Sequence, residues 1–167
     1  MRYIPNYAAG LLVTVMMAGA CLAEDATPPP KFYKLDFVVK EVEGTKVVNA
    51  RTYSVTASDE KPGTCSIRTG TKVPYSTGKD YTYLDVGVNI DCRNLRETPA
   101  GLSAWVNAEV SSVATESTMT PERPFVRQVK WGSFVVVPLK KPTVIFYSDD
   151  LTDKHQTQLE LTATPIM

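Results

Sequence analysis

Apolar and polar side chains alternate without interruption from Tyr81 to Cys92. Thr82 and the mostly aliphatic residues at every second position after it fall on one side, while aromatic, polar and glycine residues fall on the other. Because successive side chains of a strand point to opposite faces, this pattern predicts a strand with one buried face in an antiparallel sheet. The segments before and after it repeat the pattern.

Turn signals separate these alternating segments. Glu43-Gly44 and the stretch DEKPG at 59–63 are two such signals, since glycine permits positive φ and proline presets φ. The first of them predicts a hairpin. With no convincing amphipathic helix, the sequence predicts an all-β fold of about eight strands, either an antiparallel sandwich or a partly open barrel. The expected strands are 31–42, 45–58, 64–73, 81–92, 102–113, 125–138, 142–147 and 156–164.

Four stretches are expected to interrupt the strands. Residues 74–80 and 93–101 are predicted loops, and 114–124, which has two prolines and no apolar period, is the longest predicted loop. Trp131-Gly132 lies at the centre of a long strand, where a glycine often marks a bulge or a bend.

Two neighbouring segments are apolar on both faces. They lie at 134–138 and 142–147, and the turn LKKP between them predicts an apolar hairpin from Phe134 to Tyr147. A strand without a polar face is either buried on both sides or in contact with a partner or lipid.

The N-terminus has the pattern of a secretory signal peptide. Arg2 precedes the apolar run 8–23, which ends in small residues before Glu24. This run is shorter than the roughly 20 residues that span a membrane, which disfavours an anchor. The expected organisation is a signal peptide over 1–23, a proline-rich linker over 24–31 and a single β-domain over 32–167.

Cys21 leaves two processing routes open. Cleavage after Ala20 or Ala23 gives a soluble exported protein, periplasmic or secreted. However, a small-residue run that ends in cysteine also resembles a bacterial lipobox, in which Cys21 would be lipidated and held at the outer membrane. Ala18 stands where a lipobox usually has a larger aliphatic residue, which favours soluble export.

The charges of the chain balance. Among 167 residues, 18 are basic and 18 are acidic, and 43% are apolar. A net charge near zero removes the broad attraction on which binding to nucleic acids or anionic lipids depends. We therefore expect one globular domain with no nucleic-acid partner, which meets a membrane only through lipidation of Cys21.

Cys65 and Cys92 both fall on the apolar side of their strands. An exported chain meets oxidising conditions, so the sequence predicts a disulfide between them, with two separately buried thiols as the alternative. A metal site is disfavoured because His155 is the only histidine and no C-x-x-C pair exists.

Catalytic signals are weak. His155 is the only candidate general base, and the sequence has neither a G-x-S-x-G elbow nor an H-E-x-x-H helix. The acidic stretch 149–153 lacks the spacing of a calcium loop and is interpreted as a solvated turn. We expect no catalytic residue, no metal and no cofactor.

Exposed aromatic and aliphatic side chains are the remaining candidates for function. Large rings on outward faces can anchor a binding surface, unless a second layer covers them. The expected contact surface consists of Tyr81, Tyr83, Trp105, Phe134, Val136, Ile145 and Tyr147.

Three short motifs follow one another in the second half of the chain. Gly70–Pro74 fits G-x-x-(I/V)-P, Tyr83–Ile90 fits Y-x-x-(V/I)-G-(V/I)-x-(L/I), and Glu109–Ser111 fits E-(V/I)-S ahead of the two apolar segments. In this order, over roughly residues 64–150, they resemble the C-terminal β-domain of bacterial secretins. Secretins are the outer-membrane channels of type II secretion and type IV pilus systems.

The chain also departs from the secretin pattern. SDDLTDK replaces the glycine-rich segment after the last hydrophobic strand, and LKKP stands where the hairpin turn usually carries D-G. No counterpart of the large N-terminal ring-building domains is present in the sequence. The resemblance therefore implies a secretin-like β-architecture, an envelope location and multimeric assembly, without a channel.

Two hypotheses for function follow from the sequence. The first is a non-enzymatic exported domain of the bacterial cell envelope that acts through protein–protein contacts or self-assembly. The alternative is a small-ligand or carbohydrate-binding β-sandwich that uses the outward aromatic residues Tyr81, Tyr83 and Trp105.

The intact mass of the protein purified from its native envelope tests the predicted processing. We expect a chain that lacks the signal peptide and begins after Ala20 or Ala23, because the small residues there suit a signal peptidase. Added acyl mass on a chain beginning at Cys21 would select the lipidated form. A mass that still includes residues 1–20 would contradict both routes.

Overall fold

The computed structural model describes residues 29–76, 78–113, 126–149 and 155–166, and every regular element in these ranges is a β-strand. The strands are β1 (Phe32–Glu43), β2 (Lys46–Ser58), β3 (Cys65–Ser76), β4 (Tyr81–Thr98), β5 (Gly101–Val113), β6 (Val126–Val137), β7 (Thr143–Asp149) and β8 (His155–Ile166).

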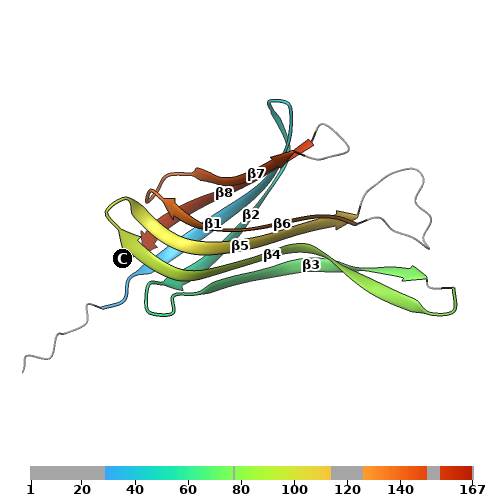
Figure 1. Ribbon diagram of the computed structural model, residues 1–167, viewed down its shortest axis with the longest axis horizontal. Helices are drawn as coiled ribbons and strands as arrows, with labels where there is room; N and C mark the ends of the chain where they lie inside the picture. The colour runs from blue at the N-terminus through green and yellow to red at the C-terminus, as the bar shows by residue number, and fades with distance from the viewer. Residues whose placement is uncertain (1–28, 77, 114–125, 150–154, 167) are drawn as a thin grey trace, which may run out of the picture.

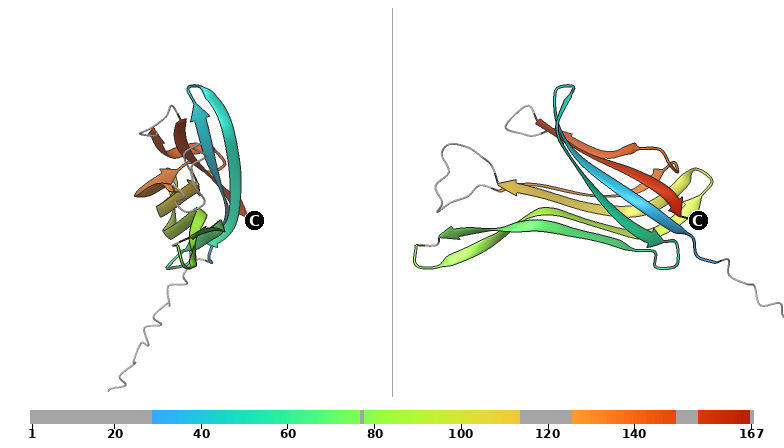
Figure 2. Two further views of the ribbon diagram at one scale, coloured as in Figure 1. Left: turned by 90° about the vertical axis from the view of Figure 1, so that its right-hand side faces the viewer. Right: turned by 180° about the vertical axis from the view of Figure 1, so that it is seen from behind.

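The strands form two antiparallel sheets of four. The first sheet has the order β2-β1-β8-β7 and the second has the order β3-β4-β5-β6 (Figure 1). Seen from the end and from behind, the sheets are two layers whose strands cross at an angle (Figure 2). The all-β fold predicted from the sequence is confirmed, with the sandwich as its form.

The core lies between the two layers and follows the alternation of the sequence. Leu35 and Phe37 of β1 are completely covered, as are Ile90 of β4 and Val106 of β5. Each of these residues lies two or more positions from the next buried residue of its strand, as expected when one face of each sheet packs on the other. The hairpin between β1 and β2 is also present, with Gly44 at a φ of 62° in its turn.

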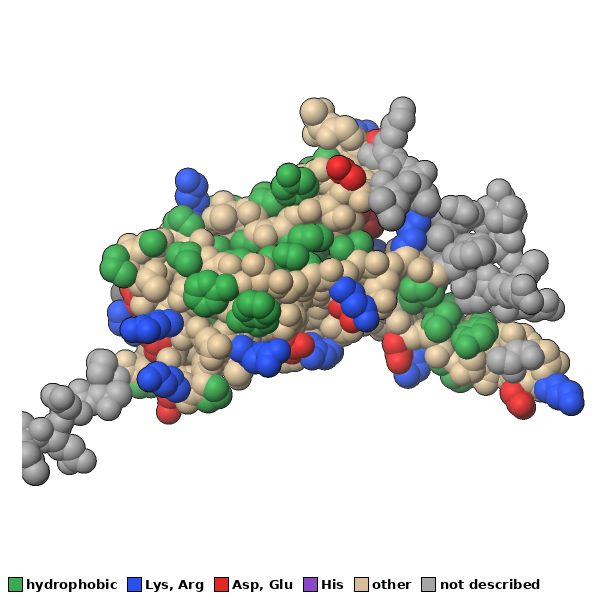
Figure 3. Space-filling model, viewed as in Figure 1, with side chains coloured by type: hydrophobic (Ala, Val, Ile, Leu, Met, Phe, Trp, Pro, Cys, Tyr) green, Lys and Arg blue, Asp and Glu red, His purple; other side chains and the backbone are tan. Residues whose placement is uncertain are grey.

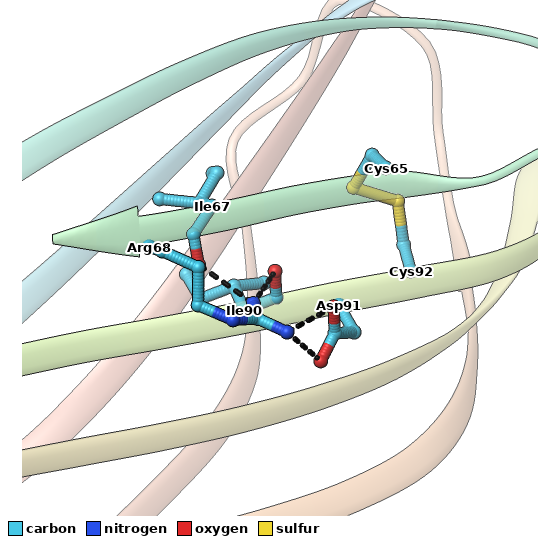
Figure 4. Close-up of polar contacts among 6 residues, drawn as sticks. All are labelled: Cys65, Ile67, Arg68, Ile90, Asp91 and Cys92. Atoms are coloured by element: carbon cyan, nitrogen blue, oxygen red, sulfur yellow. Dashed lines mark hydrogen bonds and ion pairs between the residues drawn. A yellow bond between two sulfur atoms is a disulfide. The ribbon is translucent and has the colours of Figure 1, made fainter.

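The disulfide between Cys65 and Cys92 is present in the structure. The two residues lie directly opposite each other on β3 and β4, with their Cα atoms 4.9 Å apart, and both are buried (Figure 4). It ties the edge strand of the second sheet to its neighbour.

Strand β3 is longer than the sequence pattern predicts. It continues through Pro74 to Ser76, a stretch that was expected to be a loop. Pro74 is paired with Tyr83, and β3 is an edge strand of its sheet. Proline is tolerated at such an edge when its nitrogen points away from the neighbouring strand, because no ladder hydrogen bond is then lost.

Strand β4 also continues past its expected end, through to Thr98. Asn94, with a φ of 57°, takes up a register shift against β5, so the ladder resumes after it. The backbone N–H of Asn94 donates to Pro62 O at 3.1 Å, and that of Leu95 donates to Gly63 O at 3.2 Å. This register shift is a bulge, and the turn before β3 holds it in place. Because β4 continues through the bulge, the prediction of a loop over 93–101 is wrong.

The expected irregularity at Trp131-Gly132 is not found. The pairing of β5 with β6 keeps one register from Val113↔Val126 to Leu102↔Val137. The amide oxygen of Asn107 on β5 occupies the space that a Cβ on Gly132 would need. The strand therefore needs no bulge there.

The predicted apolar hairpin from Phe134 to Tyr147 is wrong, because β6 and β7 belong to different sheets. In the turn between them, Lys140 N donates to Ala163 O at 2.8 Å, and Leu139 bridges to Ala163 of β8. This anchoring carries the chain from the second sheet to the first. Burial on both faces is also not found, since Phe134 and Val136 are exposed.

Within the described residues there is no helix long and apolar enough to cross a membrane. The predicted signal peptide and Cys21 lie outside the described residues, as does most of the acidic stretch 149–153. The division into signal peptide, linker and a single domain stays a prediction.

Replacement of both Cys65 and Cys92 by alanine should lower the free energy of unfolding by about 3.5 kcal/mol. The reason is that the bond closes a loop of separation 27 and restricts the unfolded chain. Urea denaturation of the oxidised protein and of the double variant measures the difference. A reduced native protein that is as stable as the oxidised one would contradict the prediction.

Candidate functional site

Large apolar side chains lie on the outer face of the second sheet, at the end where β5 begins. Trp105 of β5 is 39% exposed and lies directly opposite Phe134 of β6, which is 55% exposed. Val136, two positions further along β6, is exposed as well. Hydrophobic side chains gather on this part of the face (Figure 3). We call these three residues the outer patch.

The ring of Trp105 is fixed by its neighbours. Its indole N–H donates to Asn107 Oδ1 at 3.2 Å, and its Cζ2 atom lies 3.8 Å from the position a Cβ on Gly132 would take. The edge of the indole that carries the N–H is thus directed toward Asn107, two positions further along β5.

A shallow depression of about 460 Å³ lies on the outer face of the sheet, beside Asn107. It is open to solvent, and its lining includes Ala108, Trp131 and Gly132. We call it the polar depression. The charged and amide side chains that line it are Arg68, Asn89, Asp91, Asn107, Glu109 and Lys130.

The charges of the polar depression are paired with one another. Arg68 Nη2 donates to both carboxylate oxygens of Asp91 at 2.7 Å, and its Nη1 donates to Ile67 O at 2.9 Å (Figure 4). Across the depression, Lys130 Nζ lies 3.3 Å from Glu109 Oε2. Both pairs are largely exposed to solvent, and together they leave the depression with no net charge.

A second feature is a two-stranded ribbon at the other end of the second sheet. It consists of residues 71–76 of β3 and 81–86 of β4, and we call it the distal ribbon. The register of β4 with β5 begins only at Val88↔Val110. Beyond that point the distal ribbon continues away from the first sheet (Figure 1).

Ser111 marks the point where β5 leaves β4. The backbone N–H of Gly87 donates to Ser111 Oγ at 3.0 Å, and Ser111 Oγ lies 3.4 Å from Gly87 O. A side-chain hydroxyl thus replaces the backbone partner that the ladder would otherwise supply. Among the described strands, none pairs with the same edge of residues 81–86.

Two glycines lie opposite each other where the distal ribbon begins. Gly70 of β3 pairs with Gly87 of β4, whose φ is 154°. A Cβ on Gly87 would collide with Thr69 O and with the Cα of Gly70. The close approach of the two backbones therefore requires glycine on β4.

The two tyrosines of the expected contact surface lie on the distal ribbon. Tyr81 is 76% exposed and Tyr83 is 59% exposed. Trp105 is paired with Arg93, and at roughly 3.3 Å per residue Arg93 lies about 33 Å along β4 from Tyr83. The structure therefore does not bring these tyrosines together with Trp105.

The remaining residues of that surface lie on the first sheet. Tyr147 of β7 is exposed on its outer side, whereas Ile145 is partly buried against the core. The expected single surface is thus divided among the outer patch, the distal ribbon and β7. That these residues contact a partner stays a prediction.

One polar cluster was not found by sequence reasoning. Glu97 of β4 accepts hydrogen bonds from Tyr33 Oη at 2.7 Å and from Lys31 Nζ at 2.5 Å, which links the two sheets. The bond and charge of Lys31, followed by the bond from Tyr33, lower the pKa of Glu97. Burial, and then the contact with Glu97, raises the pKa of Tyr33. The only signal in the sequence was a tyrosine on an apolar face, which requires a partner for its hydroxyl.

His155 lies at the start of β8, and in the described part of the chain no three histidine, cysteine or acidic side chains gather as metal ligands.

No protein-family model matches this sequence, and no curated protein matches it either. Solved structures do match. The chain is similar to secretin GspD in a pilotin–secretin AspS–GspD complex of ETEC, with a TM-score of 0.49 and 9% identity, over 81% of this chain and 48% of the other. It is also similar to InvG, the secretin of the Salmonella SPI-1 type III secretion injectisome, with a TM-score of 0.45 and 9% identity, over 83% and 64%.

A third similar structure is the type II secretin XcpQ of Pseudomonas aeruginosa, with a TM-score of 0.44 and 11% identity, over 82% of this chain and 57% of that one. The chain spans about half to two thirds of the length of these three. The resemblance to secretins expected from the sequence is thereby confirmed, and it concerns the fold alone.

Replacement of Glu97 by glutamine should destabilise the protein at neutral pH and have little effect in acid. A carboxylate whose pKa is lowered in the folded state stabilises the fold above its ordinary value of 4.5. This contribution is lost as the pH falls from 4.5 through the lower folded pKa. Urea midpoints of native protein and Glu97→Gln between pH 7 and pH 2 measure it.

The exposed Glu43 at the end of β1 provides the matched control, as Glu43→Gln. Its midpoint should follow that of the native protein at every pH. A difference between native protein and Glu97→Gln that stays constant down to pH 2 would contradict the role of the Glu97 charge.

Proposed function

We propose that this chain is a non-enzymatic, exported, secretin-like domain of the bacterial cell envelope that works by binding protein. The observation that carries the proposal is the distal ribbon, which extends beyond the point where Ser111 ends the pairing of β4 with β5. Support for export comes from the signal-peptide pattern and from the disulfide, since such bonds persist in oxidising compartments.

The distal ribbon offers backbone groups that a further strand can use. Backbone groups of alternate residues point to the same edge of a strand, so the N–H groups of Tyr83 and Asp85 follow that of Gly87, which points toward Ser111. The proline at position 74 agrees with this assignment, because its missing N–H costs nothing in the pair with Tyr83. Within the described strands nothing pairs with this edge, so residues 81–86 of β4 present donors and acceptors to an incoming strand.

The side chains of the distal ribbon suit the same role. Val73 and Leu84, which are paired across the ribbon, and Val86 are only partly buried. Tyr81 and Tyr83 project from the other side. A strand added at this edge would bury apolar area on one face and aromatic area on the other, at about 25 cal/mol per Å².

The first partner to test is a second copy of this chain. A second ribbon carries the same free edge, and two antiparallel edges of identical sequence can satisfy each other's backbone groups around a twofold axis. A different envelope protein that supplies an extended segment is the other outcome.

Replacement of Tyr83 by proline should weaken self-association at least about tenfold, because it removes an outward N–H from the edge of β4. Tyr83→Val is the matched control, since it removes the ring but keeps the N–H and a strand-forming side chain. Sedimentation velocity of the mature protein over a range of concentrations measures association. Crosslinking in intact envelopes identifies other partners.

The proposal fails if the native protein stays monomeric at high concentration and no envelope protein is crosslinked to the ribbon. Equal effects of Tyr83→Pro and Tyr83→Val would contradict the role of the backbone edge and indicate a contact made by the ring alone.

A further inference from the structure

We propose that the outer patch and two arginines beside it bind an acidic protein segment, one that carries carboxylates next to an apolar anchor. The arginines are Arg93 and Arg96 of β4, and we call them the arginine pair. This surface lies on the outer face of the second sheet, whereas the distal ribbon offers an edge of β4. The inference therefore does not depend on the function proposed for that edge.

The register of three strands places these residues in two rows. In the first row, Phe134 of β6 lies opposite Trp105 of β5, and Trp105 lies opposite Arg93 of β4. The next row on the same face consists of Val136, Ser103 and Arg96. Residues directly opposite each other project from the same face of a sheet. Since neighbouring strands are about 4.8 Å apart, the arginine pair lies about 10 Å from the apolar side chains of β6.

The arginine pair is available to carboxylates. Both side chains are exposed, and within the described residues neither has an ion pair or a side-chain hydrogen bond. The nearest acidic residues of β4 are already engaged. Asp91 accepts two hydrogen bonds from Arg68, and Glu97 accepts from Lys31 and Tyr33. Each guanidinium thus keeps its donors for an incoming carboxylate, which it can hold with two parallel bonds.

The centre of the two rows can lose its water without leaving a polar group unsatisfied. The hydroxyl of Ser103 donates to Arg96 O at 2.9 Å, and the indole N–H of Trp105 donates to Asn107 Oδ1 at 3.2 Å. Burial of a polar group is costly mainly where the group loses its hydrogen-bond partner. An apolar anchor placed there would therefore gain from burial of the Phe134 side chain, the most exposed of the outer patch.

The chemistry of this surface is that of a protein interface. Tryptophan and arginine are enriched among the residues that contribute most to binding between proteins. Lysine and arginine side chains border the hydrophobic ones on this face (Figure 3). The complementary surface has an apolar side chain over the outer patch and carboxylates about 10 Å away, over the arginine pair.

A second copy of this chain does not supply that complementary surface. A twofold interface uses the same patch on both copies, and the two rows contain no carboxylate. Two arginine pairs would thus meet without a counter-charge, which disfavours the contact.

A lipid surface also fits less well than a protein. Apolar groups that bind a membrane surface are buried about 5–10 Å into it. The outer patch lies on the face of a sheet, and Ser103 between its members is only 4% exposed. Side chains held so close to the backbone suit a matching protein surface, not insertion.

Selection of a random peptide library, displayed on phage, against the immobilised mature protein tests the inference. We expect selected peptides to combine aspartate or glutamate with an aromatic residue or leucine. Once synthesised, they should shift the indole N–H signal of Trp105 in the ¹⁵N-labelled protein and bind more weakly in about 0.5 M than in about 0.05 M NaCl. Selected peptides that are basic or uncharged, or that leave the Trp105 signal unshifted, would overturn the inference.

Co-sedimentation with vesicles of phosphatidylethanolamine and phosphatidylglycerol tests the lipid alternative. We expect no binding of the mature protein to them. Binding that is lost in the double variant Arg93→Gln with Arg96→Gln would assign the surface to lipid and overturn the inference.

The same double variant should weaken binding of the selected peptides at least about tenfold and remove its salt dependence. Arg68→Gln with Lys130→Gln is the matched control, because it removes equal charge from the same face at cations that are already paired. That control should bind like the native protein. Equal losses in the two double variants would show that only overall charge matters, which contradicts the inference.

Phe134→Ser tests the apolar anchor. It should weaken peptide binding at least about tenfold, and the melting temperature should change little because the side chain is 55% exposed. Unchanged affinity in this variant would overturn the proposed role of the outer patch.

Discussion

The packing of one face of each sheet against the other is the constraint on which the rest of the structure depends. Residues such as Phe37 and Ile90 are covered only where the two layers overlap. Beyond that overlap the strands of the second sheet continue without a core, which leaves the distal ribbon with half-buried valine and leucine side chains. The free edge of the distal ribbon results from this unequal reach, whereas the outer face is free because each sheet packs through one face only.

The sequence was sufficient for the features that depend on local periodicity. All eight strands were predicted, and so were the inward positions of Cys65 and Cys92, because a strand repeats every two residues and a buried face must be apolar. Features set by long-range contacts were not predictable. The bulge at Asn94 depends on carbonyls of a distant turn, and the separation of β6 from β7 depends on the anchoring of Lys140 to β8.

The candidate site was predicted less well than the fold, for the same reason. The outward direction of Trp105 and Tyr83 follows from alternation, but their distance from each other depends on the register of β4 with β5. Similarly, the placement of Asn107 against Gly132 requires a cross-strand register that no local pattern contains. Without that register the glycine suggested a bulge, whereas it makes room for the amide of Asn107.

The outer face and the edge of the second sheet expose different chemical groups. An edge exposes backbone groups that repeat along the strand, so it recognises another backbone and is nearly indifferent to sequence. A face exposes side chains alone, and on this face the charges of Arg68 and Asp91 are paired with each other. The two surfaces follow each other along β4, since residues 81–86 form the distal ribbon and Asn89 and Asp91 line the polar depression.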